Sequence, residues 1–173
     1  MRALLPIALL ALAACSQSND QESADDFASR IGSGEIDPSQ ADPNAPNTAV
    51  KSPPPGANLT QLQQLGDVAG VNLGPRQGGC TFMVGSQEMI IAAGMNEATL
   101  PGKAVVRVGD TLVMMDAGPG GLEGIKNGTK FEGEGFSLAM SVAAGAGQSR
   151  NANVVMRDAA GNTSQYSGKW ICA

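Results

Sequence analysis

The fold is decided by the stretch KAVVRVGDTLVMM, which covers residues 103–115. Two short runs, rich in valine and other apolar residues, flank the pair Gly109-Asp110. A glycine-containing connection of two residues between such runs is typical of a β-hairpin. The stretch therefore predicts two antiparallel strands, 103–108 and 111–115, joined by a tight turn.

The same pattern of short runs and glycine turns continues on both sides of this hairpin. Asn127-Gly128 carries the strongest hairpin signal of the chain and predicts a second pair of strands, 122–126 and 129–134. Apolar residues alternate with small polar ones from Phe136 to Val142, as in a half-buried strand. Further strands are expected at 80–84, 88–92, 154–157, 163–166 and 169–172. These ten runs, which contain no long helical pattern, predict an all-β domain of seven to nine short strands, built as a small antiparallel barrel or sandwich.

Methionine supplies much of the expected core, because aromatic residues make up only 3% of the chain. Thioethers are soft ligands for copper(I), and Met114 and Met115 are the candidate pair for such a site. Adjacent residues of a strand point to opposite faces of the sheet, so these two side chains are not expected to meet at one ion. We therefore interpret the methionines as gap-filling core residues and expect no metal site.

The first fifteen residues have the features of an export signal. A positive start, Met1-Arg2, precedes an apolar run, Ala3–Ala14, that is too short to cross ~30 Å of hydrocarbon. This run ends in Leu12-Ala13-Ala14-Cys15, which resembles the lipobox of bacterial lipoproteins. The resemblance implies a signal peptide, 1–14, that is cleaved before Cys15, and a diacylglyceryl group on the sulfur of that cysteine. The alternative is an ordinary signal peptide that is cut nearby, with Cys15 incidental.

The residue after the cysteine bears on localisation. In enterobacterial lipoproteins an aspartate at this position favours the inner membrane, and this chain has Ser16 there. The resemblance therefore implies a protein anchored by lipid in the cell envelope, on the outer membrane and facing the periplasm. The membrane contact is expected through the lipid on Cys15, which is also the only cofactor-like group that we expect.

A lipid-anchored, acidic and proline-rich tether is predicted for 15–57. Seven acidic residues and two basic ones lie within 16–66, and six of the ten prolines lie between Pro38 and Pro55. Such a composition is typical of disorder with extended polyproline character. Two short segments nevertheless have helical spacing: 23–31, with Phe27 and Ile31 four residues apart, and 58–65, with three leucines. The second helix is expected to pack on the edge of a β-domain that covers 58–173.

The other two cysteines, Cys80 and Cys172, form an even pair in a protein that the lipobox sends to an oxidising compartment. A disulfide between them would join the two ends of the β-domain and stabilise it by roughly 4 kcal/mol in the chain-entropy model. Two reduced thiols or a redox-active pair are the alternatives. Because catalytic pairs are usually close in sequence, as in C-x-x-C, a structural disulfide is favoured.

Composition excludes several classes of function. The chain has no histidine, so it can hold neither a Ser-His-Asp triad nor an imidazole zinc site. Its net charge of −5 argues against a nucleic-acid partner. Glu132 and Glu134 are two apart and could imitate the paired carboxylates of a glycosidase, but neighbouring Lys130 makes a solvated strand face the better interpretation. We expect a protein that is not an enzyme.

In size, all-β character and cysteine pairing, the domain is similar to the membrane-bound C-type lysozyme inhibitors. That family carries a Ser-Gly-x-x-Tyr loop, and the nearest match here is Ser167-Gly168-Lys169-Trp170, which has tryptophan in place of tyrosine and lies beside the terminal cysteine. We do not transfer the family's site to these residues. The leading hypothesis is an envelope lipoprotein that presents its β-domain for binding. Its ligand is unspecified, and the partner that we consider is an envelope protein. The alternatives are a structural or assembly lipoprotein and an inhibitor-like module.

Overall fold

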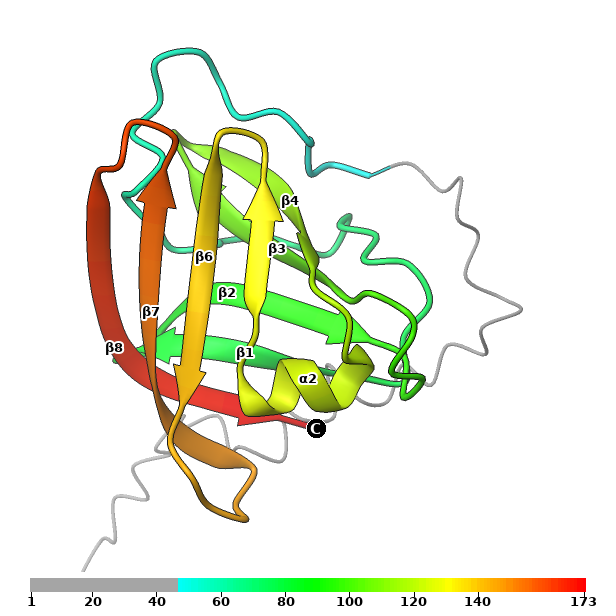
Figure 1. Cartoon of the computed structure of the whole chain (residues 1–173). Coiled ribbons are helices and arrows are strands. Elements are labelled where there is room, and N and C mark those ends of the chain that lie inside the picture. The colour runs from blue at the N-terminus through cyan, green and yellow to red at the C-terminus, as the bar shows by residue number, and fades with distance from the viewer. Residues whose placement is uncertain (1–46) are drawn as a thin grey trace, which may run out of the picture.

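The computed structural model describes residues 47–173, which form a closed antiparallel β-barrel of eight strands (Figure 1). Each strand pairs with the next along the chain, and β8 returns to pair with β1. The predicted all-β fold is confirmed, and the barrel is the one of the two predicted forms that occurs. The strands are β1 Gly78–Val84, β2 Gln87–Gly94, β3 Lys103–Val108, β4 Thr111–Ala117, β5 Lys130–Gly133, β6 Phe136–Val142, β7 Ser149–Asp158 and β8 Thr163–Cys172.

The hairpin predicted from residues 103–115 is present as β3 and β4. Val108 pairs with Thr111, and the two residues between them, Gly109 and Asp110, have φ values of 54° and 61°. Positive φ at both central positions defines the turn whose twist matches that of the flanking strands. This turn fixes the register of the whole hairpin and places Lys103 opposite Asp116.

The hairpin predicted across Asn127-Gly128 is wrong. Residues Gly121–Asn127 form the helix α2, which lies across one end of the barrel and contacts β1, β2 and β6 (Figure 1). Leu122 and Ile125, three residues apart, are both buried, as expected for one face of a helix. Gly128 follows the helix with φ 93° and donates its N–H to the Ile125 carbonyl. Asn-Gly therefore ends a helix here, because a left-handed glycine suits a helix C-terminus as well as a tight hairpin.

Residues 47–77, here called the strap, pack on the barrel before β1 begins. The predicted end of the tether at residue 57 is therefore wrong: Ala49 is buried, and Val50 forms a parallel bridge with Val113 of β4. Residues 15–46 of the predicted tether, and the predicted helix 23–31, lie outside the described residues. In Figure 1 the strap, which starts in cyan, runs beside β4 and then over the end of the barrel opposite α2.

The helix predicted for 58–65 is also wrong, because this part of the strap is irregular and extended. Gln63 forms an antiparallel bridge with Arg107, and Leu65 donates its N–H to the Glu88 carbonyl at 2.8 Å. Asn58 accepts from the backbone N–H of Thr60, a local side-chain bond that competes with helix formation. The barrel edge satisfies the backbone of this segment, so its leucines are directed to different places: Leu62 to the barrel interior and Leu65 to the outer face.

Two apolar clusters result. The first fills the barrel with alternate residues of all eight strands, including Phe82, Phe131 and Trp170, which are completely buried. The second lies between the strap and the outer face of β2, β3 and β4, where Ala49, Leu65 and Leu73 cover Val105 and Leu112. The strap thus adds a second layer to one side of the barrel.

Candidate functional site

The interior of the barrel is occupied by side chains. Phe82, Phe131 and Trp170 are 0% exposed, and Met115 and Met156 fill the space beside them at 1% and 0%. Ile125 of α2 and Leu62 of the strap belong to the same cluster and cover the two ends of the barrel. Any ligand would therefore bind on the outer surface, where hollows lie beside the strap and beside the C-terminal end of α2.

The largest of these hollows, here called the strap cleft, has a volume of about 630 Å³. It opens where β4 and β5 diverge, because only Asp116–Glu132 and Ala117–Phe131 pair between these two strands. The strap enters this gap: the Val50 N–H donates to the Leu112 carbonyl and the Val50 carbonyl accepts from Met114, at 2.9 and 2.8 Å. The cleft is lined by Asn47, Ala49, Lys51, Asn72, Gly74, Pro75, Lys103, Met114, Asp116, Glu132, Gly133 and Glu134.

Charged groups of both signs surround the strap cleft. Lys103 lies 3.9 Å from Asp116 across the β3–β4 register, and both side chains are well exposed, at 43% and 76%. Glu132 is paired with Lys130 at 2.5 Å, and Glu134 accepts a hydrogen bond from the Ser52 hydroxyl of the strap. Exposed pairs of this kind contribute little to stability, so they can be exchanged for a ligand at small cost.

Ala49, Pro75 and Met114 form the apolar part of the cleft lining. Asn47 donates its side-chain N–H to the Asn72 carbonyl at 2.7 Å and contacts the Met114 sulfur at 3.7 Å. A lining that combines apolar residues with several polar groups is typical of a binding site for a small polar molecule or a peptide segment.

Sequence reasoning found part of this site. Glu132 and Glu134 were singled out, and both line the strap cleft, Glu132 from β5 and Glu134 from the turn after it. Both side chains are exposed, in agreement with the solvated face that we expected. Lys103 and Asp116 were missed, although the Gly109-Asp110 turn sets a register that places them opposite each other. Lys51 could not be predicted as a residue of this cleft, because nothing in the sequence shows where a proline-rich segment packs.

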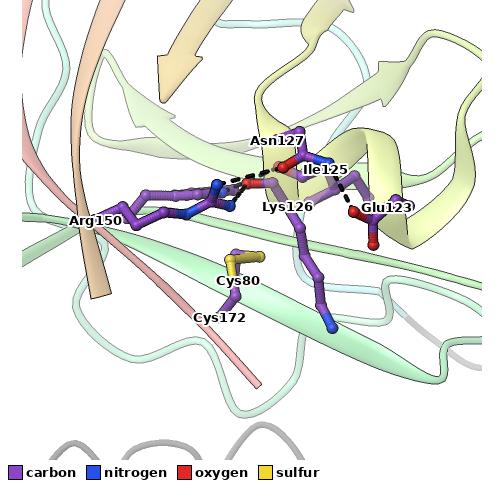
Figure 2. The surroundings of a disulfide bond; sticks show 8 residues. Cys80, Glu123, Ile125, Lys126, Asn127, Arg150 and Cys172 are labelled. Atoms are coloured by element: carbon purple, nitrogen blue, oxygen red, sulfur yellow. Dashed lines mark hydrogen bonds between the residues drawn. A yellow bond between two sulfur atoms is a disulfide. The ribbon is translucent and has the colours of Figure 1, made fainter. Parts of the chain in front are cut away.

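Cys80 and Cys172 form the predicted disulfide (Figure 2). They are register partners of β1 and β8, with Cα atoms 4.0 Å apart, so the bond joins the two strands that close the barrel. Trp170 lies directly opposite Phe82 and donates its indole N–H to the Ile125 carbonyl at 3.0 Å. Trp170 and Cys172 therefore share the inward face, as their spacing of two predicts.

Arg150 fixes the end of α2 beside the disulfide. Its guanidinium donates to the Lys126 carbonyl and to the Asn127 side-chain oxygen, while Asn127 donates to Glu123 at 2.7 Å (Figure 2). Lys126, Arg150 and Cys172 also line a smaller hollow of about 270 Å³. A cation at the C-terminus of a helix stabilises the exposed carbonyls there.

Three further predictions concern Cys15, the methionine pair and the Ser-Gly motif of the last strand. Cys15, the predicted lipid attachment site, lies outside the described residues. Met115 points into the barrel and Met114 outward, as their alternation predicts. Ser167–Trp170 lies within strand β8, with Trp170 buried, and does not form a loop.

Residues 47–173 contain no cluster of three or more histidine, cysteine or carboxylate groups arranged for a metal ion. Within the same residues no helix is long and apolar enough to span a membrane. No protein family, no curated protein and no solved structure matches the chain.

Proposed function

We propose that this protein is a lipid-anchored binding protein of the bacterial cell envelope, without enzymatic activity, which holds its ligand in the strap cleft. The observation that carries the proposal is that side chains fill the barrel interior. Because Phe82, Phe131 and Trp170 are completely buried there, a ligand would bind on the outer surface. There the strap cleft offers about 630 Å³, within the usual size range of ligand sites.

The anchor is supported by the lipobox Leu12-Ala13-Ala14-Cys15. One acyl chain binds a membrane marginally, whereas two or three hold a protein firmly. The residues between Cys15 and Asn47 span about 100 Å when fully extended at ~3.3 Å per residue. The barrel could then work at a distance from the outer membrane, in the periplasm, on another envelope protein or on the cell wall.

A role in binding is also supported by the distribution of charge. Residues 47–173 contain nine acidic and nine basic side chains, so the net charge of −5 comes entirely from the first 46 residues. A neutral barrel with both charges around one cleft suits a ligand that itself carries both charges. The exposed, paired state of Glu132 and Glu134 gives neither carboxylate the buried environment that a general acid requires.

The anchor is tested by labelling cells with palmitate. The wild-type protein should incorporate the label, because the cysteine sulfur carries the diacylglyceryl group, and Cys15→Ser should not. Ser16→Ala keeps the cysteine and is the matched control, with labelling retained. Equal labelling of Cys15→Ser and the wild type would contradict the anchor.

The binding site is tested by photo-crosslinking in intact cells. A photoreactive amino acid placed at Lys51 or Asp116 faces the strap cleft, whereas one at Ser141 or Gln165 lies on exposed positions of β6 and β8. We expect a discrete crosslinked product from the cleft positions alone. The same products from all four positions, or none from the cleft, would refute a ligand site in the strap cleft.

A further inference from the structure

The strap leaves a second hollow on the outside of the barrel, here called the side groove. Residues 66–76 arch over the outer faces of β2 and β3 and enclose about 310 Å³. Its lining combines apolar residues with the charged side chains of Asp67, Arg76 and Glu88. The apolar lining consists mainly of Val68, Val71, Leu73, Ile91, Ala93 and Val105.

This groove is half open, although it borders the outer apolar cluster. Val68, Val71 and Ile91 are only partly buried, whereas Leu73, Ala93 and Val105 behind them are buried. The space is about that of two large side chains. The side groove therefore offers a partly apolar lining and room for a short amphipathic segment.

The chain that precedes the barrel enters beside this groove. Asn47, the first described residue, donates its side-chain N–H to the Asn72 carbonyl at 2.7 Å. Thr48 donates its N–H to the Gly70 carbonyl at 3.5 Å. Both acceptors lie within residues 66–76, several of which line the side groove, although Asn47 and Asn72 themselves line the strap cleft. Residues 16–46 therefore join the described chain next to the segment that borders both hollows.

Those residues contain few candidates for an apolar site. Phe27, Ile31 and Ile36 are the only large apolar residues in 16–46, and Phe27 and Ile31 have the spacing of one helix face. Asp25, Asp26 and Arg30 accompany them, so this segment carries charges of both signs, as the groove does with Arg76, Asp67 and Glu88.

We propose that Phe27 and Ile31 of the same chain occupy the side groove. The fifteen residues 32–46 reach up to about 50 Å, more than enough to return to a groove beside their point of attachment. Because the segment is covalently attached, its local concentration is in the millimolar range, so even a weak contact is populated.

The contact would set the distance between the barrel and the lipid, a consequence that rests on the anchor proposed above. With Phe27 docked, the residues 16–26 allow about 35 Å between Cys15 and the barrel, against about 100 Å for 16–46 when the contact is released. A ligand or load that pulls the segment away would thus extend the reach of the protein.

The test is hydrogen exchange on the full chain, comparing the wild type with Phe27→Ser/Ile31→Ser. Docking should slow exchange of amides in 66–76 and at Glu88–Ala93, and the double variant should lose about fivefold of this protection, because a covering segment closes local openings. Ile36→Ser removes the third large apolar residue and is the matched control, with protection retained. Val68→Ser changes the groove instead of the segment and should match the double variant.

Four results would overturn the docking. These are equal exchange in the wild type and the double variant, equal loss in Ile36→Ser, full protection in Val68→Ser, and protection that rises with protein concentration, which would indicate a second copy in the groove. The exchange is measured on the chain whether or not Cys15 carries lipid, so failure of the docking and failure of the anchor are distinguishable.

Discussion

Gly168 of β8 shows how one missing side chain permits the closure of the barrel. A Cβ atom at this position would lie 2.1 Å from the Met83 carbonyl oxygen and 3.0 Å from the Phe82 ring. Neither neighbour can move easily, because one is backbone of β1 and the other is a completely buried ring. Only glycine allows β8 to lie this close to β1.

We therefore predict that Gly168→Ala lowers the free energy of unfolding by about 3 kcal/mol, at the upper end of the usual cost of overpacking. Gly118→Ala is the matched control, because its Cβ would meet only the Thr129 hydroxyl at 3.9 Å. Urea denaturation followed by tryptophan fluorescence measures both. A midpoint for Gly168→Ala equal to that of the control would show that the strands can separate without loss.

Asp158 makes the β7–β8 turn sensitive to acid. Its carboxylate accepts hydrogen bonds from the side chain and the backbone N–H of Asn162, and these bonds lower the pKa of Asp158 below its ordinary value of 3.8. A carboxylate with a lowered pKa in the folded state stabilises above the ordinary value, and this contribution is lost as the pH falls through the lowered pKa.

We predict that the turn 158–162 is ordered at neutral pH and loosens below about pH 3.8, as the carboxylate becomes protonated and stops accepting from Asn162. The exchange and chemical shift of the Asn162 amide, followed by NMR from pH 7 to pH 2, report this change. Asp158→Asn keeps an acceptor oxygen without a titrating proton, so its turn should not respond. Identical titration curves for the variant and the wild type would assign the change to another group.

At the scale of elements, the strap is held to the barrel by a small number of defined contacts. The Tyr166 hydroxyl accepts from the Leu62 N–H and donates to the Thr60 carbonyl, both at 2.9 Å. Arg107 donates to the Leu65 carbonyl, at 2.8 Å from its Nε atom. Two side chains of the barrel thus bind the backbone of a segment that has little regular structure of its own.

Tyr166→Phe should loosen the strap without opening the barrel. The variant removes one acceptor and one donor and leaves the Leu62 N–H and the Thr60 carbonyl without this partner, at a cost of about 1–3 kcal/mol. Faster hydrogen exchange at 60–65, with unchanged exchange in β6 and β7, is the expected result. Ser167, the neighbour of Tyr166 in β8, makes an exposed hydrogen bond to Asn153 of β7, and Ser167→Ala should change neither rate of exchange.

The elements also show where sequence reasoning succeeds and where it ends. Gly109-Asp110 determines a hairpin, because only a left-handed pair fits between strands that already alternate. Asn127-Gly128 is locally compatible with a turn and with a helix end, and the barrel opening that Leu122 and Ile125 cover decides between them. The same holds for Leu62 and Leu65, whose burial depends on two surfaces that are distant in sequence. The pairing of β3 with β4 could be predicted from their turn, whereas the packing of the segments that cover the barrel could not.

The strap cleft, too, could be predicted from the sequence only in part. Its two inner charges, Lys103 and Asp116, are a consequence of hairpin register and were within reach of the sequence. The gap that makes the cleft, however, arises because β5 is short and α2 intervenes between it and β4. The cleft forms where two strands separate and a third segment packs between them. Such a site has no short sequence motif by which it could be recognised.

At the scale of the whole molecule, the barrel is closed by the pairing of β1 with β8, which extends over only Cys80–Met83. The disulfide lies at one end of this pairing and joins residues 92 apart in sequence. In the unfolded chain it closes a long loop, and such a crosslink stabilises a domain by about 4 kcal/mol in the chain-entropy model. That is a large fraction of the 5–15 kcal/mol that is usual for a domain.

We predict that Cys80→Ala/Cys172→Ala shifts the unfolding of the barrel to a lower denaturant concentration by a free energy of about 4 kcal/mol. Trp170 reports the event, because it lies opposite Phe82 next to the disulfide, and its emission should move to the red when β8 leaves β1. Reduction of the wild-type protein should give the same midpoint as the double variant, since both remove the crosslink and keep the remaining contacts. Cys172→Ala alone is the control, because it also breaks the disulfide but keeps the Cys80 side chain in place. If the reduced and oxidised proteins unfolded at the same denaturant concentration, the β1–β8 hydrogen bonds and the Phe82–Trp170 contact alone would be sufficient to close the barrel.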